Sequence, residues 1–409
     1  MSSKTRTDSQ LCEALDSVDW NFVDYNPSER APEIHGLHWY PAPFPPGLAG
    51  TLIEVLGSGG KFLDPFSGSA VGPIEAWLRG YDTYGIDVNP AAIGIARAKV
   101  ALLRAGTAEQ GRLLCDEYTA LRNAQLPRIR ASSTTELCEA FAMDNDTLRW
   151  FAPDVVAELA VVKEWIATGG FASGWRDVLK VLVSAILHKR LSELREVHYT
   201  YIVDRSKTTR RPTRLVDSSS EIVKKIMASF IQFEISRNRL LRAGMMPGGR
   251  QCDPTFITSS SEEGIRCVGT EIDLVVTSPP YFGMNDYVRS QYLTHLVFPD
   301  SKFSNQLSLE IGARRDRRSA ARLNDYLLVL ERSFKEIGMR VSAGGCVAVI
   351  LGTSITTSAS IRPQLGALER ALRAAEMKML WAGSRRVIYR KINNTPFREE
   401  HIWVLRKGD

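Results

Sequence analysis

The residues best suited to hold a small ligand lie between Asp64 and Ala70, where an apolar run ends in a glycine turn. Lys61–Phe66 is predicted to be a buried strand. Glycine and small side chains at the end of a parallel strand let the backbone approach a ligand closely. Asp87 ends the next predicted strand, 19 positions after Gly68. An acidic residue near this spacing typically accepts hydrogen bonds from ribose hydroxyls. The turn alone would fit an ordinary strand–helix connection equally well, but together with Asp87 it favours a ribose-containing ligand.

A second group of residues, Thr277-Ser278-Pro279-Pro280-Tyr281, follows the apolar run Ile272–Thr277. Consecutive prolines fix the backbone and lack N–H donors, so their carbonyls can point into a site. The amino group of a nucleic-acid base has two N–H donors, which a serine hydroxyl and a proline carbonyl can accept. A neighbouring tyrosine ring can stack on a base extruded from its helix. The alternative is a rigid turn with a buried tyrosine, but the preceding strand and the first motif favour the amino-group site.

These segments resemble the motifs of the amino-methyltransferases that modify N4 of cytosine or N6 of adenine in DNA. The family's cofactor motif, Asp-Pro-Phe-x-Gly-Ser-Gly, matches Asp64–Ser69, and its catalytic motif, Ser/Asp-Pro-Pro-Tyr, matches Ser278–Tyr281. A third family motif, Tyr-Pro-Ala-x-Phe, borders the methionine part of the cofactor and matches Tyr40–Phe44. The resemblance implies S-adenosylmethionine as cofactor and a Rossmann-like α/β methyltransferase sheet that ends in an antiparallel hairpin.

The chain departs from the family pattern in two respects. Ala70 and Val71 stand where glycine and threonine are common, and the added methyl of Ala70 is expected to crowd the cofactor turn slightly. In the better-known serine-type members the catalytic motif comes first, whereas here it comes last, which indicates a permuted arrangement. Ser278 resembles the N4-cytosine group, and an aspartate at this position would resemble the N6-adenine group. Cytosine N4 is therefore the favoured target.

The resemblance also implies the roles of individual residues. The residues expected to bind S-adenosylmethionine are Tyr40, Pro41, Phe44, Asp64, Pro65, Phe66, Ser67, Gly68, Ser69, Asp87, Asn89 and Thr277. The residues expected to carry the transfer are Ser278, Pro279, Pro280 and Tyr281. Ser278 and the Pro279 carbonyl would orient the amino group, and Tyr281 would stack on the base, with Phe282 or Tyr287 in support. This chemistry needs no cysteine nucleophile, and the sequence contains no Pro-Cys dipeptide.

Two basic clusters are candidates for contacts with nucleic-acid phosphates, one at 205–214 and one at 314–318. The residues expected to contact nucleic acid are Arg205, Arg210, Arg211, Tyr287, Arg289, Arg314, Arg315, Arg317 and Arg318. The alternatives are solvated loops, ion pairs with nearby acids such as Glu310, and, for Tyr287 and Arg289, packing on a helix face.

The pattern of apolar residues predicts two α/β parts around a helical insertion. Residues 1–36 are predicted to form an irregular arm, and glycines 57–60 to end a short helix in the left-handed conformation. One βαβ unit is expected from a strand over 61–66, a helix over 70–79, a strand over 84–88 and a helix to Leu103. Helical spacing recurs over 155–165, 178–194 and 222–241, with a basic, strand-prone stretch before the last. The second α/β part comprises strands over 272–277 and 345–351, helices over 325–341 and 361–375, and an antiparallel pair over 386–390 and 401–406.

Composition favours an ordinary folded enzyme. The chain has 409 residues, 44% hydrophobic, with a formal net charge of +6, which suits a polyanionic partner but does not prove one. The first residues lack the apolar stretch of a signal peptide, and no apolar run is long enough to span a bilayer, so the expected location is the cytoplasm. The six cysteines form no CxxC pair and the six histidines show no ligand spacing, so no metal site is expected.

The sequence therefore predicts a catalytic domain made of residues 1–103 and 251–409, with a mainly helical insertion at 104–250 that recognises the target. The expected substrate is double-stranded DNA, and a cognate restriction or defence partner is possible. The alternatives are an N6-adenine DNA enzyme, an RNA or tRNA amino-methyltransferase, and a non-catalytic nucleic-acid-binding relative. An added RNA-binding module is usual in the RNA enzymes, and none is evident at the N-terminus.

Overall fold

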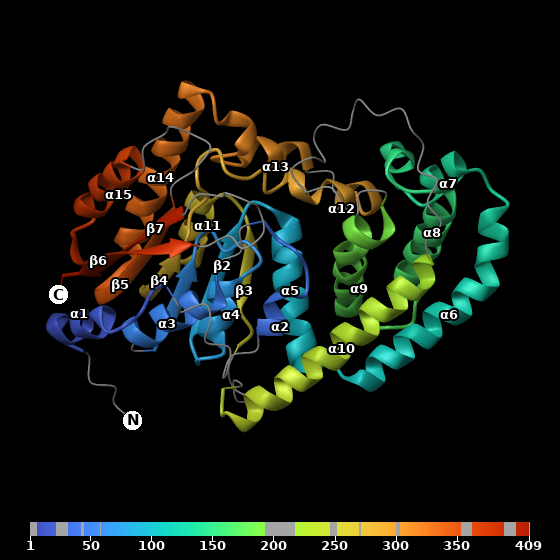
Figure 1. The fold of residues 1–409 in the computed structure, drawn as a ribbon, viewed down its shortest axis with the longest axis horizontal. Helices are drawn as coiled ribbons and strands as arrows, with labels where there is room; N and C mark the ends of the chain where they lie inside the picture. The colour runs from blue at the N-terminus through green and yellow to red at the C-terminus, as the bar shows by residue number, and fades with distance from the viewer. Residues whose placement is uncertain are drawn as a thin grey trace.

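A computed structural model of the chain describes residues 6–21, 32–41, 45–57, 59–192, 217–245, 252–269, 271–299, 303–352, 362–387 and 398–408. Within these residues, seven strands form one sheet in the order β3-β2-β1-β4-β5-β7-β6 (Figure 1). The strands are β1 (Lys61–Asp64), β2 (Asp82–Asp87), β3 (Thr255–Thr258), β4 (Ile272–Thr277), β5 (Val341–Gly352), β6 (Met377–Val387) and β7 (Arg398–Lys407). The first five are parallel, while β7 runs antiparallel to both β5 and β6. The predicted Rossmann-like α/β sheet with its terminal antiparallel hairpin is confirmed.

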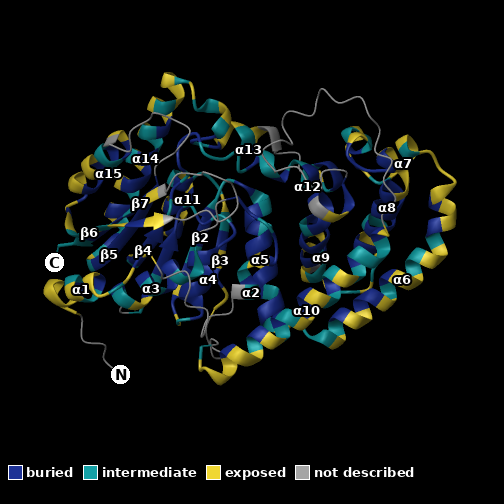
Figure 2. Cartoon of the chain, in the orientation of Figure 1, coloured by how far each residue is buried: buried dark blue, intermediate teal, exposed yellow. Residues whose placement is uncertain are grey.

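Both faces of the sheet are covered because successive side chains in the central strands point to opposite sides. Phe62 and Leu274 pack in one apolar cluster, whereas Leu63 and Val275 pack in another. The helices α1 (Asp8–Asp16), α3 (Pro46–Leu56), α4 (Val71–Trp77) and α5 (Pro90–Ala105) pack on the first face. The helices α11 (Ser261–Val268), α14 (Ala320–Arg340) and α15 (Arg362–Ala374) pack on the second. Figure 2 shows the dark strands between these partly exposed helices.

Some local expectations were wrong. The N-terminal region is no irregular arm, because α1 buries Leu11 and Leu15 and begins with a capping box between Thr7 and Gln10. A short helix, α2 (Pro32–His35), lies farther along the same region. The helix α3 ends at Gly57 in an extended conformation, and positive φ angles occur only later, at Gly59 and Gly60.

The strand β3 and the helix α11 were not predicted. The run Thr255–Thr258 contains only four residues, which is too short to show a periodic pattern. It becomes a strand because it pairs in parallel with β2 along Tyr84–Asp87.

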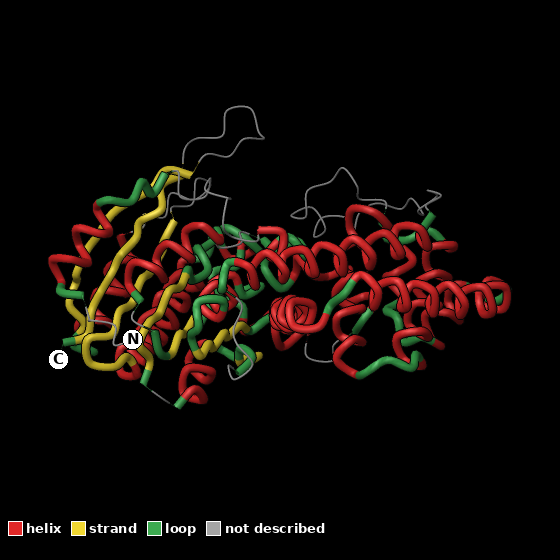
Figure 3. The backbone as a smooth tube through the Cα atoms, turned by 90° about the horizontal axis from the view of Figure 1, so that it is seen from below, coloured by secondary structure: helices red, strands yellow, loops and turns green. Residues whose placement is uncertain are grey.

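The described part of 104–250 consists of helices joined by short loops and contains no strand. The helices are α6 (Ala108–Arg130), α7 (Thr134–Ala140), α8 (Pro153–Thr168), α9 (Ser173–Ile186) and α10 (Ser218–Arg242). They lie beside the sheet and extend the molecule along its long axis, as the view from below in Figure 3 shows. Their apolar side chains share one cluster with α5, so the helices are packed directly against the α/β part. The basic stretch at 205–214 lies outside the described residues.

After the catalytic motif, the short helix α12 (Tyr292–Val297) docks onto these helices. The Tyr292 hydroxyl donates to Asp146 at 2.9 Å, and the Lys163 ammonium donates to the carbonyl of Val297 at 2.7 Å. The chain then continues through α13 (Phe303–Leu309). The helical insertion is therefore joined both to α5 and to the segment that follows the catalytic motif.

Candidate active site

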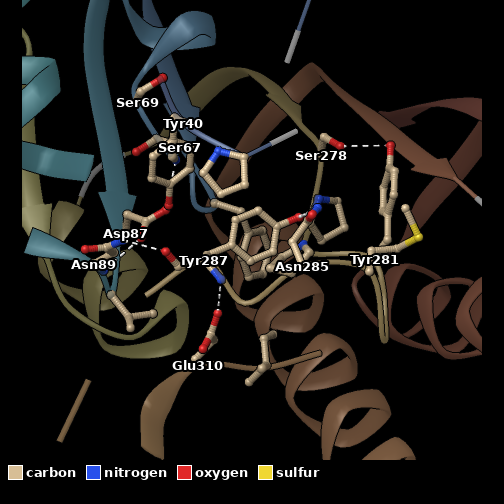
Figure 4. Close-up of a pocket in the computed structure, with 18 of the residues that line it drawn as sticks. Tyr40, Ser67, Ser69, Asp87, Asn89, Ser278, Tyr281, Asn285, Tyr287 and Glu310 are labelled. Carbon is tan, nitrogen blue, oxygen red and sulfur yellow. Dashed lines mark hydrogen bonds between the residues drawn. The ribbon is translucent and has the colours of Figure 1, made fainter. Parts of the chain in front are cut away.

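A cavity of about 530 Å³ opens at the carboxyl ends of the central strands. Its lining includes Gly68 and Asp87 from the first motif and Ser278, Pro279 and Tyr281 from the second. The two motifs are 210 positions apart from Gly68 to Ser278 in the sequence, and β1 and β4 bring them together because they are neighbours in the sheet. In Figure 4 the first-motif side chains lie on one side of the cavity, Ser278 and Tyr281 on the other, with Tyr287 between them.

Most of the predicted site residues line this cavity. They are Tyr40, Pro41, Asp64, Pro65, Phe66, Ser67, Gly68, Ser69, Asp87, Asn89, Ser278, Pro279, Pro280, Tyr281 and Tyr287. Thr277 is fully buried and does not line the cavity. Phe282 is also buried, and its ring packs on Tyr326 with a centroid distance of 5.5 Å. Phe44, Arg205, Arg210 and Arg211 lie outside the described residues.

The glycine turn is shaped by its contacts with Asp87 and Tyr40. Gly68 has a φ of +51°, and its N–H donates to one Asp87 oxygen at 2.9 Å, while the Asn89 N–H donates to the other at 2.8 Å. A Cβ at Gly68 would lie 3.0 Å from the Tyr40 ring. Glycine is therefore required here both by its backbone conformation and by close packing.

Ala70 explains why glycine is common at the end of this motif. Its φ of 62° and ψ of 45° are left-handed, a conformation that costs a non-glycine residue about 1–2 kcal/mol. Its methyl is fully buried, and burying a methyl-sized group contributes about 0.8 kcal/mol in return. The departure from the family pattern is thus a local strain that burial partly offsets.

Asp64 joins the ends of β1 and β4. The Thr277 hydroxyl donates to its Oδ1 at 2.6 Å, and the Phe66 N–H donates to the same atom at 3.1 Å. Burial raises the pKa of Asp64 to about 7, although both hydrogen bonds act in the opposite direction. Thr277 therefore supports the cavity through Asp64, which does line it. Burial likewise raises the pKa of Asp87 to about 6.

Lys99 in α5 is a functional candidate that the sequence did not reveal. Its side chain is fully buried, and the ammonium donates to the carbonyl of Ser69 at 2.7 Å. Burial lowers the pKa of Lys99 to about 7. In the sequence it is one lysine within an apolar helix, and only the fold places it beneath the cofactor turn.

On the opposite side of the cavity, four polar side chains form a chain of hydrogen bonds. The Ser278 hydroxyl is 3.1 Å from the Tyr281 hydroxyl, which donates to Glu400 Oε1 at 3.3 Å. Arg385 Nε lies 2.8 Å from Glu400 Oε2. Glu400 and Arg385 come from the terminal hairpin, and both line the cavity. The sequence analysis missed them because they carry no motif.

The wall between the two sides is fixed by Glu310. Its buried carboxylate accepts the N–H groups of Tyr287 and Val288, the latter at 3.2 Å. Arg315 donates to its other oxygen at 2.6 Å and lies 3.5 Å from Asp286. Arg315 was expected to contact nucleic acid, but in this structure it takes part in the ion pair considered as the alternative. Tyr287 lies against Tyr40 with ring centroids 6.1 Å apart.

The other members of the basic cluster are arranged differently. Arg314, Arg317 and Arg318 do not line the cavity and have no ion-pair partner within the described part of the chain. Arg314 begins the short turn Arg314–Asp316 that carries Arg315, and Arg317 and Arg318 follow it. Their role in binding nucleic acid stays a prediction, as does that of Arg289.

No cluster of three or more histidine, cysteine, aspartate or glutamate side chains suited to a metal ion occurs among the described residues. None of the helices in the described ranges is both long and apolar enough to cross a bilayer.

Comparison with known proteins finds a related sequence and distantly similar structures. No protein-family model matches the chain. The chain is 23% identical over 311 residues to the type II methyltransferase M.MvaI of Kocuria varians, covering 72% of this chain and 64% of that protein. Two structures of the rRNA methyltransferase aviRa of Streptomyces viridochromogenes match at 13% identity. The first covers 96% of this chain and 94% of the other, with a TM-score of 0.33, which is too low to relate the two activities. The chain thus spans less than two thirds of the length of M.MvaI, the relative that it matches in sequence.

Proposed function

We propose that this protein transfers a methyl group from S-adenosylmethionine to an exocyclic amino nitrogen of a base in double-stranded DNA, with cytosine N4 as the target. The observation that carries the proposal is the shared cavity, in which Gly68 of the cofactor turn and Ser278 of the tetrapeptide both take part. The similarity to a type II methyltransferase adds support. The proposal makes adenine N6 the second choice, because either a serine or an aspartate can accept a hydrogen bond from an amino group.

The residues around the turn fit a cofactor that carries a ribose. Each Asp87 oxygen accepts one backbone N–H and retains a further lone pair for a ribose hydroxyl. Ser67 Oγ is buried at the cavity and has no hydrogen-bond partner among the described residues. Tyr40, Asn89 and the turn at Gly68 would complete the cradle. When bound, S-adenosylmethionine supplies an electrophilic methyl on a sulfonium.

The protein's main task is then to position the amino group. Ser278 and the Pro279 carbonyl accept its two N–H bonds, which leaves the nitrogen lone pair directed at the cofactor side of the cavity. Holding the reactants in line converts an encounter between two molecules into a step within one complex, which lowers the barrier by several kcal/mol, up to about 7–11. The amino nitrogen would bond to the methyl carbon as that carbon's bond to the sulfonium sulfur breaks, which leaves S-adenosylhomocysteine, and one amino proton would pass to solvent. Tyr281 is proposed to contact the face of the base.

The decisive experiment is to identify the methylated nucleoside. The purified protein and methyl-labelled S-adenosylmethionine are incubated in three separate reactions with unmethylated double-stranded DNA, single-stranded DNA or RNA. The nucleic acid from each reaction is then digested to nucleosides. We expect label in double-stranded DNA as N4-methylcytosine. Label as N6-methyladenine would change the target base, and label in RNA alone would overturn the proposal.

The tetrapeptide is tested by Ser278→Ala. Because this variant removes one of two acceptors for the amino group, we expect methyl transfer to fall about 100-fold, comparable to losing one well-placed hydrogen bond in a transition state. Binding of S-adenosylhomocysteine, measured by calorimetry, should stay within about twofold. Full activity in this variant would remove Ser278 from the site.

A further inference from the structure

The terminal hairpin carries a buried ion pair that faces the proposed base side of the cavity. Arg385 lies in β6 and Glu400 in β7, and the register of the hairpin pairs these two residues directly. Their side chains are 3% and 11% exposed, and the two charged groups are 2.8 Å apart. Burying both charges is costly unless further hydrogen bonds satisfy them. The second carboxylate oxygen finds such a partner in the hydroxyl of Tyr281.

The direction of each hydrogen bond in this chain is determined by chemistry. Arginine stays protonated at any ordinary pH, and a carboxylate paired with it can only accept. Tyr281 must therefore donate its only hydroxyl hydrogen to Glu400, at 3.3 Å. The Tyr281 oxygen is left as an acceptor for the hydroxyl hydrogen of Ser278, at 3.1 Å. Ser278 has then committed its only hydrogen, and both of its lone pairs remain available for acceptance.

Close packing holds the Tyr281 ring, and with it the hydroxyl, in this position. The ring is buried against Gly352 at the end of β5, where a Cβ would lie only 2.5 Å from Tyr281 Cε2. Tyr326 holds the same loop from the other side by donating to the Pro280 carbonyl at 2.8 Å. Figure 4 shows the bond from Ser278 to the Tyr281 hydroxyl at one side of the cavity, apart from Asp87 and Asn89.

We propose that Glu400, held by Arg385, is a positioning residue that acts through the Tyr281 hydroxyl to make Ser278 a hydrogen-bond acceptor toward the amino group of the substrate. This inference rests on the proposed function of the cavity. An amino group presents donors, so a serine that donated toward it would repel it. The ion pair is thus expected to favour an amino-bearing base over one that presents a carbonyl at the same place.

The test compares single-turnover methyl transfer in four variants. Tyr281→Phe removes the hydroxyl but keeps the ring, and Glu400→Gln keeps the size of the side chain but lets it donate. Each should slow transfer about 10- to 100-fold, the range expected when a charge-assisted hydrogen bond is removed. Combining them should slow transfer no further than the worse single variant, because both act through one hydroxyl. The fourth variant, Glu399→Gln, changes an exposed glutamate on the same strand and should transfer at the wild-type rate.

Two results would overturn the proposal. An unchanged rate in Glu400→Gln would show that Ser278 needs no such orientation. Losses that multiply in the combined variant would show that Glu400 contacts the substrate directly. Because Glu400→Gln removes the negative charge that faces the buried Arg385, the variant Arg385→Gln/Glu400→Gln is made in parallel. It removes both charges and should show the same loss of rate with S-adenosylhomocysteine binding intact.

A readout independent of activity separates this inference from the proposed function. With tyrosine labelled by ¹³C at Cζ, the Tyr281 resonance is assigned by its absence in Tyr281→Phe. The chemical shift of this resonance should change in Glu400→Gln and in Ser278→Ala, and it should be the same as in the wild type in Glu399→Gln. If the wild-type protein methylates no nucleic acid, the proposed function fails, while the resonances still report whether the chain of hydrogen bonds exists. A Tyr281 resonance indifferent to Glu400 would refute the chain itself.

Discussion

At the residue scale, three titratable groups surround the glycine turn: Asp64 and Lys99, which are buried, and Asp87, which is partly buried. Their burial shifts all three pKa values toward the neutral range. Such groups are costly in a fold, because a buried polar group must be hydrogen-bonded to be tolerated. Here each holds a backbone atom of the turn or of the segment directly next to it. We infer that these residues lower the stability of the fold and make the glycine turn rigid.

The raised pKa of Asp64 predicts a pH-dependent stability. Between pH 4 and about 7 the unfolded chain loses the Asp64 proton while the folded protein keeps it, so this residue destabilises the fold increasingly as pH rises through that window. Asp64→Asn removes the effect and still accepts from Thr277. Its stability advantage over the wild type should grow from pH 4 to 7, by up to about 4 kcal/mol at 1.4 kcal/mol per pKa unit, and then level off.

Urea unfolding of both proteins at several pH values measures this difference. The exposed Asp82 supplies the matched control, since Asp82→Asn should give a difference that does not follow the same window. If the difference in the free energy of unfolding between wild type and Asp64→Asn stayed constant from pH 4 to 7, Asp64 would be ionised in the folded protein.

At the scale of elements, the wall of the cavity is made by two segments that hydrogen bonds join to each other. The Gly283 N–H donates to the Gly312 carbonyl at 2.8 Å, and the Arg314 N–H to the Asn285 carbonyl at 3.0 Å. The Glu310 carboxylate also accepts hydrogen bonds from the backbone N–H groups of Tyr287 and Val288. Neither segment is a strand, so their mutual hydrogen bonds and this carboxylate are what define their shape.

Removing the carboxylate by Glu310→Ala should loosen this wall. Two buried N–H groups would lose their acceptor, each at a cost of about 1–3 kcal/mol. Hydrogen–deuterium exchange of peptides covering 283–290 should therefore speed up about tenfold or more, and methyl transfer should slow. Glu331→Ala, which removes the partner of Arg370 in a largely exposed ion pair, should change neither. Unaltered exchange in Glu310→Ala would show that other contacts hold the segment.

The element scale also shows where pattern reading succeeds. Long or strongly apolar patterns predicted the strands β1, β2 and β4 and the helices α3, α4, α5, α8, α9, α10, α14 and α15. The strand β3 has four residues and exists because β2 offers it an edge. The helix α1 was missed because two apolar residues, Leu11 and Leu15, are too few to form a clear pattern. Their role is seen only in the fold, where they pack in one cluster with α3.

At the scale of the whole molecule, the helices of the insertion and α5 share one apolar cluster, and α12 ties the segment after the catalytic motif to the same helices. The long shape in Figure 1 therefore has a continuous interior across its two halves. The proposed role of the insertion in target recognition stays a prediction. The fold supplies a physical connection for it, because α12 links the insertion to the segment beyond Tyr281.

The basic cluster gives a prediction at this scale. The arginines 314, 317 and 318 lie free of ion pairs among the described residues, whereas Arg315 is engaged with Glu310. If the first three bind phosphates, changing them together to glutamine should reduce the slope of log K for DNA against log salt by about 0.9 for each phosphate that is no longer neutralised. Filter binding at several salt concentrations measures this slope. Arg370→Gln with Arg373→Gln on α15 is the control, and an undiminished slope in the triple variant would place DNA elsewhere.

The sequence by itself determined the motifs and their order, the strands β1, β2 and β4, the presence of a terminal antiparallel hairpin, and many of the residues that line the cavity. It succeeded there because a strand followed by a glycine turn or by two prolines fixes its own backbone. Only the tertiary structure decided that Lys99 supports the turn, that Arg315 pairs with Glu310, and that Glu400, paired with Arg385, reaches Tyr281. Apart from the pair Arg315 and Glu310, these interactions join residues that are distant in the chain. Their meaning depends on which strands become neighbours, and no local pattern of residues records that.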